Sequence, residues 1–87
     1  MVTVRIPTPL RSYTAQAASV EAHGATVAEV LDDLDRQFPG LRFRVVDEQQ
    51  RLRKHMKIFV GEESVRDLAT RIPAGLDLTL MQALSGG

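Results

Sequence analysis

The sequence predicts an α+β fold in which a mixed sheet of four to five strands packs on one main helix. Segments near both ends of the chain alternate apolar and polar residues, which is the period of a half-buried strand. Between them, residues 26–38 carry apolar side chains at helical spacing. The 87 residues, 44% hydrophobic and 25% charged, have the size and composition of one globular domain.

The N-terminal segment predicts a hairpin of two strands. Residues 2–6 alternate apolar and polar side chains, and the strand ends at Pro7, which lacks the N–H that a sheet ladder needs. A loop over residues 8–17 follows. Residues 18–22 alternate again as a second strand, which Gly24 closes.

The helix has the clearest local signals. Thr26 is an N-cap candidate, and Glu29 lies three residues further on, where its carboxylate can accept a hydrogen bond from the backbone N–H of the cap residue. Pro39 and Gly40 end the helix. The helical spacing of five apolar residues places them on one face of the helix: Val27, Val30, Leu31, Leu34 and Phe38.

The second half of the chain predicts shorter elements. Residues 41–46 are compatible with a strand or an irregular turn, with Leu41, Phe43 and Val45 pointing inward. Residues 56–60 alternate as a strand, and a short segment follows around Val65. Residues 67–72 predict one helical turn. Residues 76–81 predict the last strand, with one face formed by Leu76, Leu78 and Leu80.

A helix between two pairs of strands packs most simply under one sheet. The first and last strands can then lie side by side in parallel, because the long connection supplies the crossover. This is the β-grasp arrangement. We expect the domain to span residues 1–82 and a tail to span residues 83–87.

Charge and composition exclude several classes of protein. Eleven basic and eleven acidic residues balance to a net charge of zero, which removes the general electrostatic reason to expect nucleic acid or a membrane as partner. The absence of cysteine excludes disulfides and thiolate chemistry, and the cytoplasm is the expected compartment. His23 and His55 have no third ligand at metal-site spacing.

The basic residues are unevenly distributed. Six of the eleven lie in residues 42–57, whereas four acidic residues lie in the helix segment 29–35. This split is compatible with steering of a charged partner or with an ordinary solvated surface. A nucleic-acid site would need aromatic residues among the basic ones, and Phe43 is assigned to the interior by its apolar phase.

Two surface features suggest contacts with partners. Phe59 and Met81 fall on the outer face of their strands, where they predict an exposed apolar patch edged by Arg66. Alternatively, the tail or a loop covers Phe59. Leu84 and Ser85 extend the tail, and Leu84 is a candidate docking contact.

The sequence ends in Gly86-Gly87. A free α-carboxylate has a pKa of about 3.5 and is therefore ionised at neutral pH, able to attack the α-phosphorus of ATP. Two glycines let an extended tail enter a narrow cleft, because no Cβ restricts the backbone. The alternative is an incidental glycine-rich terminus.

These residues give the chain a family resemblance over nearly its whole length. With Gly86-Gly87 after the last predicted strand, the chain resembles the ubiquitin-like sulfur carriers of the MoaD and ThiS family. Residues 6–14, beginning Ile6-Pro7-Thr8, and residues 58–66, beginning Ile58-Phe59-Val60, resemble the family member that supplies sulfur for cysteine synthesis.

The resemblance implies a carrier rather than an enzyme, with no bound cofactor. An E1-like adenylating enzyme of the MoeB or ThiF type would activate Gly87 with ATP, and sulfur would replace AMP to form a thiocarboxylate. The implied partners also include a sulfur-accepting biosynthetic enzyme and a JAMM-type metalloprotease that trims residues beyond Gly87. Two alternatives stay open: a modifier attached to lysines through Gly87, and a noncatalytic interaction domain.

Overall fold

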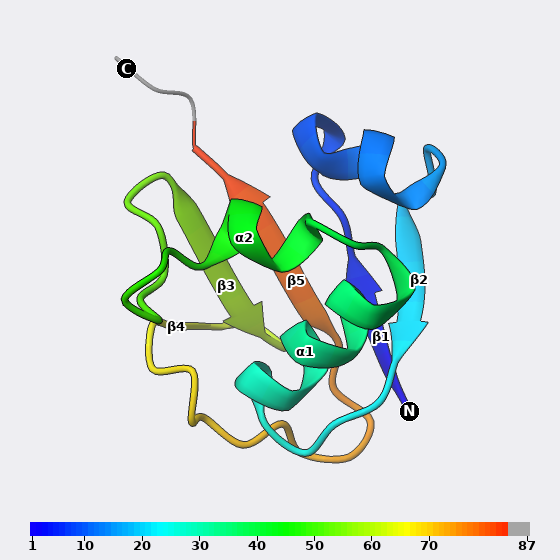
Figure 1. Ribbon diagram of the computed structural model, residues 1–87. Helices are drawn as coiled ribbons and strands as arrows, with labels where there is room; N and C mark the ends of the chain where they lie inside the picture. The colour runs from blue at the N-terminus through cyan, green and yellow to red at the C-terminus, as the bar shows by residue number, and fades with distance from the viewer. Residues whose placement is uncertain (84–87) are drawn as a thin grey trace.

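The computed structural model describes residues 1–83 and has two α-helices on one face of a five-stranded sheet (Figure 1). The strand order is β2-β1-β5-β3-β4, so the first and last strands lie together in the centre. The elements in chain order are β1 (Val2–Arg5), a 3₁₀-helix η1 (Thr8–Thr14), β2 (Ser19–Ala22), α1 (Val27–Gln37), α2 (Leu41–Val45), β3 (Met56–Val60), β4 (Glu63–Val65) and β5 (Leu78–Gln82).

The strand pairing confirms the predicted β-grasp topology. β1 pairs antiparallel with β2, as the predicted hairpin requires, and parallel with β5, where Val4 lies opposite Leu78. β3 pairs antiparallel with both β4 and β5, and Ile58 lies opposite Leu80. Because side chains alternate along a strand, these registers place one set of apolar residues on the face toward the helices.

The core lies between that face and α1. The predicted stripe of α1 is buried: Val27, Val30, Leu31 and Leu34 are each 0% exposed, and Phe38 packs half-buried at its end. Burying one such aliphatic side chain stabilises the fold by roughly 1.5–3 kcal/mol. The stripe therefore holds α1 across the sheet.

The start of α1 confirms the cap and corrects one of its bonds. The Thr26 hydroxyl accepts a hydrogen bond from the Glu29 backbone N–H at 3.2 Å. The Glu29 carboxylate, however, accepts from the N–H of Ala25 at 2.7 Å, one residue before the cap. Thr26 itself forms an antiparallel bridge with Arg71, so this part of the backbone is positioned by a distant segment.

Residues 41–45 form the short helix α2, which settles a segment that the sequence left open. Leu41 and Val45 are buried as expected, but Phe43 is 53% exposed, so its assignment to the interior was wrong. In a helix, residues i and i+4 share a face while residue i+2 lies on the other side. Strand-like alternation was therefore the wrong period for this segment.

Three further expectations need correction. Residues 8–14 form the 3₁₀-helix η1 rather than a loop, and the Leu10 N–H donates to the Pro7 carbonyl at 2.9 Å. Residues 67–70 form a turn closed by the Thr70 N–H and the Asp67 carbonyl at 3.0 Å, not a helical turn. Leu76 is 41% exposed, because β5 begins only at Leu78.

Candidate functional site

The outer face of the sheet, away from the helices, carries a small apolar patch. Lys57 lies opposite Met81, and Phe59 lies opposite Thr79 in the pairing of β3 with β5. Phe59 and Met81 are therefore diagonal neighbours on the same face. Met81 is 48% exposed and Phe59 is half-buried. We call Phe59, Thr79 and Met81 the outer patch; the structure brings together the two residues that the sequence paired.

Arg66 makes a contact away from this patch. Its guanidinium donates to the Leu52 carbonyl at 3.3 Å, in the loop between α2 and β3. Among residues 1–83, no other hydrogen bond is found for the Arg66 side chain. The structure thus joins Arg66 to that loop and shows no bond from it to Phe59 or Met81 among residues 1–83.

The end of β5 positions the start of the predicted tail. Gln82 pairs with Met56, and one residue further the Ala83 N–H donates to the His55 carbonyl at 2.8 Å. The pairing of β5 with β1 covers Leu78 and Thr79, so among residues 1–83 the point where the chain leaves the sheet is held by β3 and by the His55 carbonyl. The other predicted site residues, Leu84, Ser85, Gly86 and Gly87, lie outside the described residues.

The acidic side chains of α1 make ion pairs and hydrogen bonds with other residues of the domain. Asp32 pairs with Arg42 at 3.0 Å, and the Asp35 carboxylate accepts from the backbone N–H groups of Gly40 and Arg42, each at 3.1 Å. Glu29 caps the helix start. These contacts give the acidic residues structural roles.

Asp33 is also bonded within the domain, and these bonds lower the pKa of its carboxyl group. The His23 backbone N–H donates to its carboxylate at 2.9 Å, and this bond is the main reason that the pKa of Asp33 lies below its usual value of 3.8. Desolvation is the next largest effect and raises the pKa, whereas hydrogen bonds from the Gln37 and Arg36 side chains lower it further. Asp33 is therefore held as a carboxylate by its own helix and by the end of β2.

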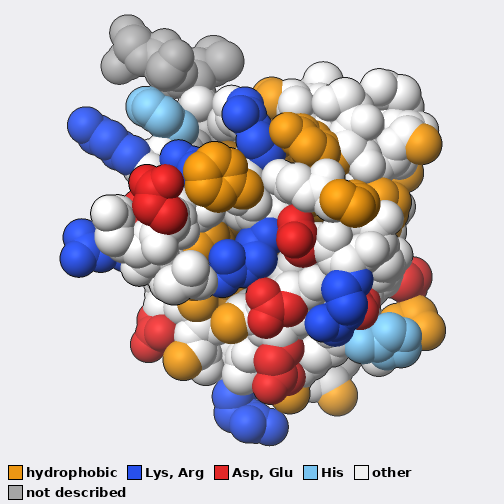
Figure 2. Space-filling model, in the orientation of Figure 1, with side chains coloured by type: hydrophobic (Ala, Val, Ile, Leu, Met, Phe, Trp, Pro, Cys, Tyr) orange, Lys and Arg blue, Asp and Glu red, His pale blue; other side chains and the backbone are white. Residues whose placement is uncertain are grey.

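The basic residues between α2 and β3 have a different environment. Figure 2 shows basic side chains gathered toward the end of β5, whereas acidic side chains lie over α1. Within residues 1–83, ion pairs join Arg5 to Asp77, Arg36 to Asp33 and Arg42 to Asp32. None of them involves a basic residue from 44 to 57.

Phe43 is the surface residue that the sequence reasoning missed. It lies beside this basic segment, with the Arg53 guanidinium 4.5 Å from its ring centroid. The i, i+4 spacing of Leu41 and Val45 was the signal that could have placed Phe43 outside. Among residues 1–83, no group of three His, Cys, Asp or Glu side chains could hold a metal ion.

The fold defines a ubiquitin-like protein of the β-grasp class, whose central C-terminal strand leads toward Gly86-Gly87. Residues 4–87 match the ThiS family, and the chain belongs to that family. In the part of the chain that the structure describes, no helix is long and apolar enough to span a membrane.

Proteins that are similar to this chain agree with this assignment. The sulfur carrier protein CysO of Mycobacterium tuberculosis is 38% identical over 91 residues, which cover 99% of this chain and 98% of the relative. In the Amycolatopsis orientalis BexX/CysO complex, the matching chain has a TM-score of 0.92 and 40% identity, with 100% of both chains covered. SAMP1 from Haloferax volcanii has a TM-score of 0.76 and 27% identity, with 99% and 98% covered.

The comparisons confirm the resemblance that residues 6–14, 58–66 and 86–87 carried. The matching mycobacterial proteins are named as sulfur carriers. Proteins of this kind carry a group for other enzymes and are not catalysts themselves. The role of this chain is accordingly that of a carrier.

Proposed function

We propose that this chain is a sulfur carrier whose reactive group is the α-carboxylate of Gly87. The observation that carries the proposal is the match to the ThiS family over residues 4–87, a range that includes Gly86-Gly87. The 38% identity to a named sulfur carrier over 99% of the chain supports it.

The proposed chemistry has two steps. An E1-like adenylating enzyme of the MoeB or ThiF type binds ATP; the Gly87 carboxylate attacks its α-phosphorus, and pyrophosphate leaves. Sulfur at the oxidation level of sulfide then attacks the acyl carbon, so that a C–S bond forms and the C–O bond to AMP breaks. The product is a Gly87 thiocarboxylate. Because the partner enzyme binds and consumes ATP, we propose no bound cofactor for the carrier itself. The proposed compartment is the cytoplasm.

The proposed binding surface combines the outer patch with the tail. Phe59 and Met81 supply exposed apolar area on the face of the sheet, and apolar anchors of this kind dominate protein interfaces. Leu84 and Ser85 would follow Ala83 into the active site of the enzyme. Arg66 would contribute at the margin of the interface, through the loop that it contacts.

A second enzyme must accept the sulfur. The related CysO from Amycolatopsis orientalis is found in a complex with BexX, which supports a protein partner for this chain as well. We therefore propose a sulfur-accepting biosynthetic enzyme as the downstream partner. A JAMM-type metalloprotease is proposed only for a precursor that extends beyond Gly87.

A second candidate function is protein modification through Gly87. The 27% identity and the TM-score of 0.76 to SAMP1 favour it, because the related Haloferax protein is described as a small archaeal modifier. Both functions begin with the same activated terminus, since an acyl-adenylate can be attacked by sulfur or by a lysine amine.

Intact-mass spectrometry tests the proposal. The protein is incubated with the adenylating enzyme of its source organism, ATP and a sulfide donor. We expect a mass gain equal to the replacement of one oxygen atom by sulfur, and no gain in a variant that lacks Gly86 and Gly87. Circular dichroism checks that this variant is folded.

Three outcomes separate the candidate functions. The sulfur mass gain supports the carrier. Covalent adducts on other proteins, lost with the glycines, would support the modifier. A deletion variant that keeps full function in cells would contradict both and leave an interaction domain.

A further inference from the structure

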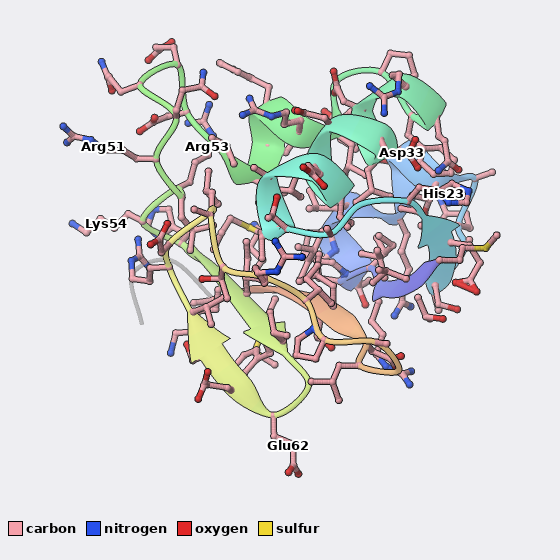
Figure 3. All side chains as sticks on the ribbon, turned by 90° about the horizontal axis from the view of Figure 1, so that it is seen from below. His23, Asp33, Arg51, Arg53, Lys54 and Glu62 are labelled. Atoms are coloured by element: carbon pink, nitrogen blue, oxygen red, sulfur yellow. The ribbon has the colours of Figure 1, made fainter. Side chains whose placement is uncertain are left out.

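A basic surface lies beside the end of β5. Residues 42–57 contain six Lys or Arg and two Asp or Glu, a formal charge of +4 in a chain whose net charge is zero. Of the six, Arg42 pairs with Asp32; the other five make no ion pair with any of residues 1–83. Figure 3 shows three of them on the side of the molecule away from His23 and Asp33. We call these five residues the basic surface: Arg44, Arg51, Arg53, Lys54 and Lys57.

Two residues of the basic surface, Arg44 and Arg53, line a hollow between α2 and the end of the sheet. The hollow is lined by Phe43, Arg44, Arg53, His55, Met56 and Gln82. Its lining includes Phe43, which is 53% exposed, and the two arginines Arg44 and Arg53. Such a combination suits a carboxylate side chain, because a guanidinium can donate two parallel hydrogen bonds to it.

Arg53 is already held in place for such a contact. Its Nε donates to the Phe43 carbonyl at 2.6 Å, and its guanidinium lies 4.5 Å from the Phe43 ring centroid. Within residues 1–83, no hydrogen bond is found for its two Nη groups. A charged group that is immobilised beforehand loses little conformational entropy on binding. Arg53 therefore has donors available in a fixed position.

The hollow also borders the point where the chain leaves the sheet. Gln82 is one of its walls, and Ala83 is bonded to the His55 carbonyl. Four residues separate Ala83 from the end of the sequence, and four residues span at most about 14 Å. An enzyme whose active site receives Gly87 must therefore bring the rim of that site close to the hollow, where Arg44 and Arg53 lie.

We propose that the basic surface, with Arg44 and Arg53 at its centre, docks an acidic rim around the tail-binding cleft of the adenylating enzyme. This inference rests on the proposed function. The adenylating enzyme is the partner that both the carrier and the modifier require. The acidic side chains of α1 are bonded within the domain, so they leave the charge of the basic surface unbalanced. Complementary charge raises the association rate and orients the tail toward the cleft.

A nucleic acid fits the hollow less well than an acidic protein does. Single-stranded nucleic acids stack their bases on exposed aromatic rings. Phe43 is the aromatic residue of the hollow, and Arg53 covers one face of its ring.

A matched pair of charge reversals tests the proposal. Arg44→Glu changes the basic surface, whereas Arg71→Glu makes the same change at an exposed arginine beside Gly61, Glu62 and Glu63, at the turn between β3 and β4. The assay is ATP–pyrophosphate exchange by the adenylating enzyme, with the protein as varied substrate. At low salt we expect KM to rise about tenfold for Arg44→Glu and less than about twofold for Arg71→Glu, with kcat unchanged.

Salt and a milder variant complete the test. Added salt should reduce the difference in KM between wild type and Arg44→Glu, because ions screen exposed charges. Arg44→Gln should give an intermediate KM, and circular dichroism should show that all variants are folded. Equal KM values for wild type and Arg44→Glu, or equal effects of Arg44→Glu and Arg71→Glu, would overturn the inference.

Two other results have distinct meanings. Loss of binding to a short single-stranded RNA in Arg44→Glu, with KM unchanged, would assign the surface to nucleic acid and also overturn the inference. Absence of exchange with the wild-type protein would refute the proposed function itself, and the inference with it.

Discussion

Replacing Gly24 by alanine tests how closely β2 and α1 approach each other. Gly24 lies in the connection between these elements, two residues before the cap of α1. A Cβ at this position would lie 2.7 Å from the Val30 backbone nitrogen and 2.9 Å from the Cβ of Glu29. Both atoms belong to the helix, so the added carbon cannot be accommodated by the rotation of one flexible side chain. The start of α1 must shift away from the strand.

The magnitude follows from a comparison with Gly75→Ala. Gly24 has a φ of +156° and Gly75 a φ of +87°, and a Cβ on Gly75 would have no neighbour within 4 Å. Backbone strain of roughly 1–2 kcal/mol is therefore the main cost at Gly75. At Gly24 the close contact adds roughly 1–3 kcal/mol, the usual cost of forcing an extra carbon into packed structure. Both variants lose the same glycine flexibility in the unfolded chain.

Urea denaturation followed by circular dichroism measures the two free energies of unfolding. We expect Gly24→Ala to lose roughly 1–3 kcal/mol more than Gly75→Ala. For a domain of this size each kcal/mol lowers the melting temperature by roughly 4–8 °C. Equal losses in the two variants would refute the reasoning, because they would show that the helix start yields to the added carbon without cost.

Three further predictions concern the outer patch, the helix cap and a carboxylate. Met81→Asp should raise KM in pyrophosphate exchange about tenfold or more by burying a charge in the proposed interface, while Leu76→Asp, an exposed control before β5, should not. Thr26→Ala should lower the free energy of unfolding in urea by about 1 kcal/mol, and Thr26→Ser should restore most of it. The pKa of Asp33 is lowered on folding, so its carboxylate stabilises the protein above its usual pKa of 3.8, and this stability is lost as the pH falls through the lowered pKa. The free energy of unfolding, measured at decreasing pH, should consequently fall less steeply for Asp33→Asn than for wild type. The same dependence on pH in both proteins would contradict this.

The outer patch and the predicted site show how far pattern reasoning reaches. The alternation of β3 and β5 correctly placed Phe59 and Met81 on one face, because neighbouring strands share their inward and outward phases. The contact made by Arg66 was not predictable in the same way. Its partner is the carbonyl of Leu52, which lies in a loop whose path no periodic pattern describes.

The short segments show where pattern reasoning fails. Five residues are too few to distinguish a period of 2 from one of 3.6, so residues 41–45 were compatible with more than one conformation. In the folded protein these residues form the helix α2, which packs against α1 and η1. In this helix the Phe43 side chain points outward, and the Arg53 guanidinium lies over its ring. The hollow beside β5 depends on this outcome, so the sequence alone did not reveal it.

By itself, the sequence determined the β-grasp order, the bounds and cap of α1, the buried stripe and the family, because each depends on signals that repeat or adjoin within one segment. Only the tertiary structure decided the partner of the Glu29 carboxylate, the pairing of the acidic residues of α1 and the unbalanced charge beside β5. These features join residues from different segments. Their free energies depend on distances that exist only after the chain has folded.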